Sequence, residues 1–286
     1  MRRAFFYLVS LLPFPILYVV SDLLVLIGGK IAGYRKSLII ENLKNAFPQK
    51  NELEIKKLIP AVYRNLTDVM LETFKLLTIS KEDLIKRIHF KDIEVINKFY
   101  YMGETVIAAT SHSGNWEWIL AACSIQLPAP ADGVYQEIKS SFFENLMYTI
   151  RSRFGSLPVE KNNVFRESLK KRNTPHIIAL VADQSPPLHD ENIHWVKFFN
   201  QDTAFYNGME RLAESFGWPV IFVSMKRLNR GHYEIGFIEL ESKPKNAKKG
   251  NIINKYAQMT EKFIKENPSD WLWSHNRWKR KKDKEF

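Results

Sequence analysis

The sequence predicts an α/β fold with a mixed, mostly parallel sheet flanked by helices. Three short, apolar, β-branched runs predict strands buried on both faces, and they lie at Thr105 to Thr110, His176 to Ala182 and Val220 to Met225. Helical patterns lie between these runs, and such alternation is typical of an α/β sheet. With 286 residues and 45% hydrophobic composition, the chain can bury a sizeable core.

An apolar run near the N-terminus predicts a membrane anchor over residues 1–30, with a second domain over 31–286. The run extends from Ala4 to Val20 and resumes from Leu23 to Ile27. It lacks the small-residue cleavage site of a secretory signal peptide, so it is expected to stay in the mature protein. Its length is near the ~20 residues that cross a bilayer, but prolines and an aspartate interrupt it. A single-pass helix, an interfacial helix and a buried core helix all stay open.

The other predicted elements are mainly helices. Apolar residues recur at helical spacing over Tyr34 to Phe47, Glu52 to Leu77, Ser80 to Arg87, Trp116 to Ser124, Ser140 to Phe154, Val164 to Lys171, Gly208 to Phe216 and Ile252 to Lys265. Ser80 is expected to cap its helix, because Asp83 stands three positions on. A strand from Tyr233 to Leu240 is expected to form an antiparallel hairpin with Val220 to Arg227.

The charge balance predicts an anionic partner. The chain has 42 Lys+Arg against 31 Asp+Glu, a formal net charge of +11. Phospholipid headgroups, an acidic carrier protein and nucleic acid would all be attracted, but no nucleic-acid module is recognisable, so nucleic acid is not expected as a partner. The single cysteine, Cys123, excludes an internal disulfide and a multi-cysteine zinc site. It is expected to lie in the core.

The segment from Thr110 to Trp118 carries the candidate chemistry, because it follows a buried strand and leads into a helix. His112 and Glu117 would lie about 140° apart on a continuous helix. They meet only if His112 lies in a turn, which Gly114 allows. The carboxylate would then fix the histidine tautomer, and the free ring nitrogen would take a proton from an attacking hydroxyl. A lone His-x-x-x-x-Glu is also typical of a hydrogen-bonded structural histidine.

Separated segments over nearly the whole chain resemble the bacterial lipid A biosynthesis acyltransferases. This lauroyl/myristoyl family is related to the glycerolipid acyltransferases, which carry His-x-x-x-x-Asp. The matching segments follow the family order: Tyr34 to Pro48, Ser111 to Glu117, Arg153 to Gly155, Ala182 to Gln184, Phe198 to Ala213 and Trp271 to Lys279.

The resemblance implies a glycerolipid-acyltransferase-like fold and late acylation of lipid A at the cytoplasmic side of the cell inner membrane. The donor would be an acyl carrier protein thioester and the acceptor a hydroxyl of a membrane glycolipid, with inner-membrane phospholipid around the enzyme and no metal or other cofactor. His112 would be the general base and Glu117 its partner. The expected substrate-binding residues are Ser111, Asn115, Arg153, Asp183 and Gln184. Backbone amides near Gly114 or Arg153 are candidates for stabilising the oxyanion.

Several alternatives stay open. Gln136 and Asn200 stand where family members often have arginine and glycine, which puts the usual acceptor or carrier contacts in doubt. Arg153 is also typical of a solvated helix end, and the pair Asp183 and Gln184 is also typical of a turn. The C-terminal aromatic residues predict either an interfacial belt or core packing, and the basic tail Lys279 to Lys284 favours anionic lipid or is simply solvated.

Other functions also fit the pattern. An acyltransferase for a lysophospholipid, an aminolipid or a pigment precursor would use the same chemistry, with a carrier-protein or coenzyme A donor. A non-enzymatic, membrane-tethered protein that binds an anionic ligand is the alternative from another class. Acyl chain length and acceptor identity depend on a pocket assembled from distant segments, so no local motif encodes them.

Overall fold

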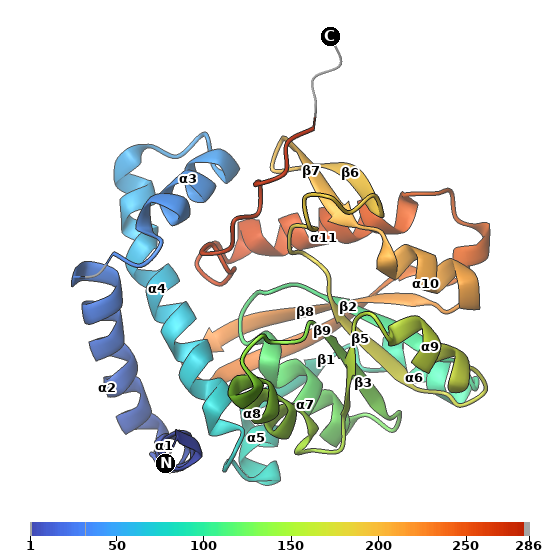
Figure 1. Cartoon of the computed structure of the whole chain (residues 1–286), viewed down its shortest axis with the longest axis horizontal. Coiled ribbons are helices and arrows are strands. Elements are labelled where there is room, and N and C mark those ends of the chain that lie inside the picture. Colours follow the sequence, from blue (N-terminus) through green and yellow to red (C-terminus); the bar gives the residue numbers. More distant parts are fainter. Residues whose placement is uncertain (1, 32, 283–286) are drawn as a thin grey trace.

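The computed structural model describes residues 2–31 and 33–282. Residue 1 of the expected membrane anchor, and residues 32 and 283–286 of the expected second domain, lie outside the described residues. Its helices (Figure 1) are α1 (Arg2–Leu11), α2 (Phe14–Leu24), the π-helix η1 (Val25–Ile31), α3 (Lys36–Ala46), α4 (Glu52–Lys75), α5 (Lys81–Arg87), α6 (Glu94–Tyr101), α7 (Trp116–Gln126), α8 (Ser141–Ser152), α9 (Val164–Lys170), α10 (Gly208–Phe216), the 3-10 turn η2 (Pro244–Asn246) and α11 (Asn251–Glu266). Its strands are β1 (Ile88–Lys91), β2 (Val106–Thr110), β3 (Ala131–Tyr135), β4 (Leu157–Glu160), β5 (Ile177–Val181), β6 (Ile193–Phe198), β7 (Gln201–Tyr206), β8 (Val220–Asn229) and β9 (His232–Glu241).

Seven strands form the central sheet in the order β1-β9-β8-β2-β5-β3-β4. Every neighbouring pair is parallel except β8 and β9, which form the expected antiparallel hairpin. Strands β6 and β7 form a separate antiparallel pair. The α/β class with a mixed, mostly parallel sheet is thereby confirmed.

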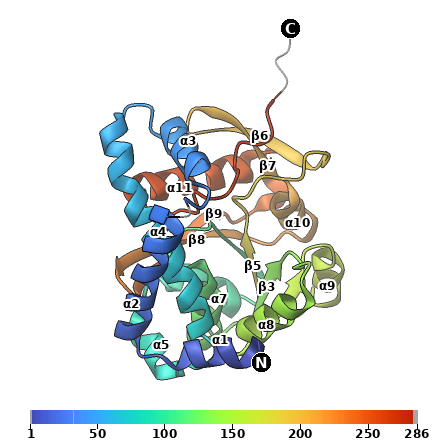
Figure 2. The same cartoon turned by 60° about the vertical axis from the view of Figure 1, so that its left-hand side comes forward.

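The sheet is buried on both faces, and its central strand shows how. Strand β2 contributes alternate residues to two core clusters, Ile107 and Ala109 to one and Val106 and Ala108 to the other, because successive side chains of a strand point to opposite faces. The first cluster also contains residues of α3, α10 and α11, and the second contains residues of α2, α5, α6, α7 and α8. Figure 2 shows these two helical layers around the sheet.

The predicted helices and the strands β2, β5, β8 and β9 are present, and Ser80 Oγ accepts a hydrogen bond from the amide of Asp83 as expected. Helix α6 and strands β1, β3, β4, β6 and β7 were not predicted. Strand β3 includes Asp132 and Gly133, which are depleted in strands, and β4 includes Pro158, which is tolerated there because β4 is an edge strand.

The N-terminal segment is two helices rather than the one that was expected. Helix α1 and the segment Phe14–Gly28 are bent by 119° relative to each other. The break falls at Pro13, which cannot donate a backbone hydrogen bond to continue α1. Among the described residues, no single helix is long and apolar enough to cross a membrane. The two parts of this bent pair reach the required length and apolar composition only when they are counted together. Both helices pack against α4 (Figure 1).

The C-terminal aromatic residues belong to the core. Trp271, Trp273 and Trp278 are at most 5% exposed, and they pack in one cluster with Phe198 and Phe199. The alternative of an interfacial aromatic belt is therefore wrong for these tryptophans.

Candidate active site

The site is built around the turn between β2 and α7. Gly114 adopts φ +58°, and a Cβ at this position would lie 3.2 Å from the side chain of Met225, so the turn requires glycine. The amide of Gly114 donates to the carbonyl of Asp270 (2.9 Å), and the carbonyl of His112 accepts from the amide of Leu272 (3.0 Å). The C-terminal segment therefore fixes the turn that carries His112.

His112 is paired with Asp183, which follows β5. Strands β2 and β5 are parallel neighbours, so the residues after them meet at the same edge of the sheet. His112 Nδ1 lies 2.6 Å from Asp183 Oδ1, and the His112 amide donates to Oδ2 (3.0 Å). Trp271 Nε1 also donates to Oδ2 (2.6 Å). Because an ionised carboxylate only accepts hydrogen bonds, Nδ1 carries the proton and Nε2 keeps a free lone pair.

The environment of Asp183 keeps its carboxyl ionised. Burial by itself would raise the pKa of Asp183, but the His112 imidazole and the hydrogen bonds from His112 and Trp271 lower that pKa to about 2. The Asp183 side chain is 2% exposed and that of His112 is 15% exposed. The imidazole therefore contacts a fixed buried anion on one side and an accessible space on the other.

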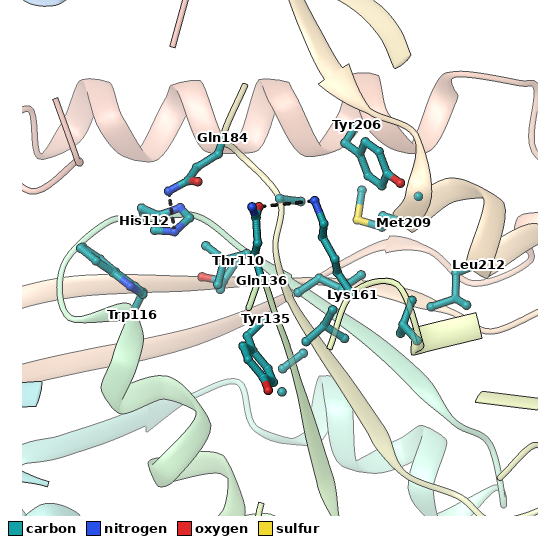
Figure 3. A pocket seen from close by; sticks show the side chains of 18 of the residues that line it. Thr110, His112, Trp116, Tyr135, Gln136, Lys161, Gln184, Tyr206, Met209 and Leu212 are labelled. Carbon is teal, nitrogen blue, oxygen red and sulfur yellow. Dashed lines mark hydrogen bonds between the residues drawn. The ribbon is translucent and has the colours of Figure 1, made fainter. Parts of the chain in front are cut away.

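Gln184 contacts the other ring nitrogen of His112. Its side-chain nitrogen lies 3.1 Å from Nε2 (Figure 3), and it is the donor, since Nε2 carries no proton. The next residue, Ser185, donates its amide to His275 Nε2 (3.0 Å). Burial lowers the pKa of His275 to about 4, so this second histidine is neutral and serves as an acceptor. The carboxamide of Gln184 occupies the place that a substrate hydroxyl would take at Nε2.

Glu117 does not make the hydrogen bond to His112 that the sequence suggested. Its two carboxylate oxygens accept from Arg151, at 3.0 Å from Nε and 2.7 Å from Nη2. Burial would raise the pKa of Glu117, but the Arg151 guanidinium outweighs burial and lowers it. The expected geometry is wrong because Asp183 already occupies Nδ1. A catalytic role for Glu117 stays a prediction, and the residue still lines the same cavity as His112.

Of the five expected substrate-binding residues only Gln184 lines the cavity, and Asp183 lies behind His112. The other three make contacts elsewhere. Ser111 donates to Ser113 and is buried. Asn115 caps α7 through the amide of Trp118. Arg153 ends α8 and donates to the carbonyl of Leu76. Each of these side chains bonds to the protein itself. For Arg153 the geometry therefore favours the alternative of a residue at a helix end over that of a substrate ligand.

The amides of Gly114 and Arg153 are themselves engaged, because the first donates to the carbonyl of Asp270 and the second to that of Ile150. The role expected for backbone amides near these two residues stays a prediction. Arg151 is a cation that lines the cavity beside Glu117.

A cavity of about 790 Å³ opens beside His112 and Glu117, within the range of small-molecule sites. Its wall is largely apolar and includes Ile119, Leu120, Val134, Leu180, Met209 and Leu212. Figure 3 shows Met209 and Leu212 on the side away from His112. Three cationic side chains also line the cavity, namely Arg151, Lys161 and Arg211. The cavity therefore combines a long apolar surface with positive charge and one reactive imidazole.

No group of three or more His, Cys, Asp or Glu side chains within residues 2–31 and 33–282 is arranged to hold a metal ion. Cys123 is buried in α7, and burial raises the pKa of its thiol to about 12. A thiol that stays protonated is a poor nucleophile, so the core position expected for Cys123 is confirmed.

The sequence prediction missed Arg151, Tyr135 and Lys161 as cavity residues. Arg151 stands two positions before Arg153, and residues two apart on a helix face directions about 200° apart, so only one of the two can face the cavity. The signal in the sequence for choosing between the two arginines was the amphipathic pattern of α8. Its buried stripe contains Leu146 and Ile150.

Comparison with known proteins gives one match. The sequence model of the family described as bacterial lipid A biosynthesis acyltransferase matches residues 2–280, which is nearly the whole chain. No curated protein matches the chain closely enough for comparison.

Proposed function

The chain belongs to the bacterial lipid A biosynthesis acyltransferase family and is therefore an acyltransferase, and we propose that it moves a fatty acyl group from an acyl carrier protein thioester to a hydroxyl of a lipid A precursor. The observation that carries the mechanism is the orientation of His112. Its Nδ1 proton is held by Asp183, and its Nε2 lone pair faces the cavity. An imidazole held in this way is a suitable general base for a hydroxyl.

In the proposed reaction the acceptor hydroxyl displaces the Gln184 carboxamide from His112 Nε2. The hydroxyl oxygen attacks the thioester carbonyl carbon while Nε2 takes its proton, and a tetrahedral intermediate forms. The carbon–sulfur bond then breaks, and the imidazolium returns its proton to the leaving thiolate. Asp183 stabilises the imidazolium while it exists, as in other histidine–carboxylate pairs.

Arg151 is the residue that we assign to the developing negative charge. Glu117 accepts from its Nε and Nη2, and within the described residues Nη1 makes no hydrogen bond to protein. The pair fixes the guanidinium plane in a cavity that is partly closed to water, where a fixed charge acts strongly on a developing oxyanion. In this proposal Glu117 supports catalysis through Arg151 rather than through the imidazole.

The cavity suits the two substrates of this reaction. The apolar wall provides a surface for the acyl chain, and each buried CH₂ contributes about 0.8 kcal/mol. Lys161 Nζ lies 3.4 Å from Gln136 Oε1, so a cation stands beside the position where relatives often have arginine. Together with Arg211 it is placed to contact an acceptor phosphate or an acidic carrier protein.

We place the enzyme at the cytoplasmic side of the cell inner membrane, attached to phospholipid through α1 and α2. Many large apolar side chains on these helices and on η1 are at least 44% exposed, namely Phe5, Tyr7, Leu8, Leu11, Ile16, Val19, Leu23, Leu26 and Ile27. Such a concentration of exposed apolar side chains is typical of a membrane-binding surface.

The test is acyl transfer from a radiolabelled acyl carrier protein thioester to a membrane lipid extract, with mass analysis of the product. We expect a labelled lipid A precursor from the wild type and a loss of at least ~10²-fold for His112→Ala. The exposed histidine of β1 offers a matched control, since His89→Ala removes an imidazole far from the cavity and should leave transfer unchanged.

The other outcomes identify the alternatives. A labelled lysophospholipid, aminolipid or pigment precursor would keep the chemistry and change the acceptor. Transfer from coenzyme A alone would change the donor. Absence of transfer from both donors by folded protein would favour a non-enzymatic, anionic-ligand-binding protein.

A further inference from the structure

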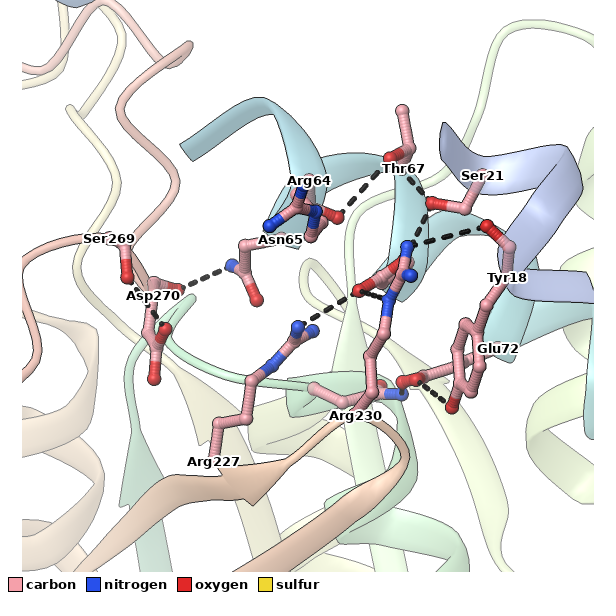
Figure 4. A network of polar contacts seen from close by, with 12 residues as sticks. Tyr18, Ser21, Arg64, Asn65, Thr67, Glu72, Arg227, Arg230, Ser269 and Asp270 are labelled. Carbon is pink, nitrogen blue, oxygen red and sulfur yellow. Dashed lines mark hydrogen bonds and ion pairs between the residues drawn. The ribbon is translucent and has the colours of Figure 1, made fainter. Parts of the chain in front are cut away.

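A buried polar network joins the N-terminal helices to the turn that carries His112. It centres on two carboxylates of α4, Asp68 and Glu72, both of which are 0% exposed. They stand four positions apart and so lie on the same face of the helix. Figure 4 shows side chains of α2, α4 and the β8–β9 hairpin gathered in the network that contains Glu72.

Glu72 accepts hydrogen bonds from three different elements. Its Oε1 accepts from the hydroxyl of Tyr18 on α2 (2.8 Å), and its Oε2 accepts from Tyr233 on β9 (2.6 Å) and from Asn115 Nδ2 (2.7 Å). Its backbone carbonyl also accepts from Trp118 Nε1 (2.9 Å). A buried carboxylate is tolerated when its oxygens are hydrogen-bonded in this way.

The contact with Asn115 connects this network to the active site. Asn115 is three residues after His112, and its side-chain oxygen caps the first turn of α7 by accepting from the amide of Trp118 (3.2 Å). The two ends of one carboxamide therefore hold the start of α7 and Glu72 together. Since the turn between β2 and α7 carries the imidazole, the position of Glu72 bears on where that imidazole lies.

The N-terminal helices are held beside α4 and the β8–β9 turn by further polar contacts. Ser21 donates to Asp68 (2.5 Å), and Asp22 pairs with Arg230 in the β8–β9 turn (2.8 Å). At the break between α1 and α2, Lys75 Nζ donates to the carbonyls of Ser10 (2.8 Å) and Leu12. Those carbonyls close α1, and a cation is favourable at the C-terminal end of a helix.

We propose that Glu72 is a positioning residue for the His112 turn and that α2, through Tyr18, completes its hydrogen-bonding. The proposal rests on the proposed function, because it assigns the network a role in the turnover of His112. It makes the N-terminal helices part of the catalytic unit, which differs from the division into a membrane anchor over residues 1–30 and a catalytic domain over 31–286.

The test compares Tyr18→Phe with the wild type in detergent micelles, where attachment to a bilayer makes no contribution. Without the Tyr18 hydroxyl, Glu72 can turn towards its remaining donors and shift Asn115. We expect kcat to fall about tenfold with little change in KM, because a displaced imidazole affects the chemical step rather than binding. The matched control is Tyr101→Phe on α6, since the Tyr101 side chain is 74% exposed and its variant should keep wild-type kcat.

A second variant removes the link from the other side. Asn115→Ser keeps a helix-capping side chain but loses the donor to Glu72, so it should lower kcat in the same way. If both substitutions act through Glu72, the fold-decrease in kcat of the combined variant should be smaller than the product of the two single fold-decreases. Independent losses that simply multiply, or a Tyr18→Phe variant with wild-type kcat, would overturn the proposal.

Hydrogen exchange measured by mass spectrometry gives a readout that does not depend on turnover. The peptide covering residues 111–118 should exchange faster in Tyr18→Phe and at the wild-type rate in Tyr101→Phe. Unchanged exchange would also overturn the positioning role. Failure of the proposed function looks different, because wild type and His112→Ala would then show equal transfer whatever the exchange data.

Discussion

Two buried ion pairs meet the same cavity, one through His112 and the other through both Glu117 and Arg151, and they differ in the nature of their cation. Asp183 pairs with His112, whose imidazole can gain and lose a proton, whereas Glu117 pairs with Arg151, whose guanidinium stays charged. The side chains are similarly buried, with exposures of 15% and 2% in the first pair and 19% and 13% in the second.

The difference separates two roles that the sequence motif had combined. A carboxylate beside an imidazole sets its tautomer and stabilises its protonated form. A carboxylate beside a guanidinium fixes a permanent positive charge in place. In the proposed mechanism, proton transfer and charge stabilisation are therefore assigned to different residues.

The largest effect is expected when the first pair is broken. Asp183→Asn removes the charge that stabilises the imidazolium, and its amide nitrogen can force the proton of His112 onto Nε2. We expect kcat to fall by ~10²–10⁴-fold with a much smaller change in KM, measured by acyl transfer in micelles.

The opposite result would restore the arrangement suggested by the sequence. If Asp183→Asn kept wild-type kcat while Glu117→Gln lost it, Glu117 would be the carboxylate that acts on His112 during the reaction. Both variants should be compared at equal folded fraction, because both carboxylates are largely buried.

Breaking the second pair should reduce stability as well as turnover. Arg151→Met leaves the Glu117 carboxylate buried without its partner, so we expect the free energy of unfolding to fall by ~3–5 kcal/mol in denaturant titrations. Glu117→Leu in the same chain should recover most of this loss. The exposed pair of Lys98 and Glu239 is a control, since Lys98→Met should cost less than ~1 kcal/mol. An equally small loss for Arg151→Met would show that the cavity pair is solvated.

The sequence predicts the core of the fold better than its edges. Strands β2, β5 and β8 are predictable because their β-branched apolar residues match burial on both faces, as in Val106 and Ile107. Strands β3 and β4 are not, because Asp132, Gly133 and Pro158 contradict the local preference for strand. They form because neighbouring strands supply hydrogen-bond partners.

The same distinction applies to the site. His112 was predictable, since a turn after a buried strand gives it a chemical context within a few residues. Its pairing with Asp183 was not, because that contact depends on β2 and β5 lying side by side, 71 positions apart in sequence. Glu117 was assigned to the imidazole because it is near in sequence, although its own partner, Arg151, comes from a different helix.

The second histidine of the site, His275, extends the comparison to the dependence of stability on pH. Within the part of the chain that the structure describes, no carboxylate pairs with His275, and burial lowers its pKa to about 4 from an ordinary value near 6.5. Between these values the unfolded chain binds more protons than the folded one, so the free energy of unfolding is highest above about pH 6.5 and falls as pH drops towards 4. We expect His275→Gln to remove ~1–3 kcal/mol of this dependence while keeping an acceptor for Ser185. Identical pH curves for wild type and variant would mean that the pKa of His275 is the same in the folded and unfolded chains.

The smallest effect is expected at the apolar end of the cavity, away from both pairs. Leu212 lines the wall on the side opposite His112 (Figure 3), and Leu212→Trp should fill part of the space assigned to the acyl chain. Each CH₂ that no longer fits forfeits about 0.8 kcal/mol, or roughly fourfold in kcat/KM. Competition between donors of different length should therefore shift towards shorter chains, while kcat with a short donor stays at the wild-type value because neither ion pair is disturbed. An unchanged preference would place the acyl chain elsewhere and leave this wall to the acceptor.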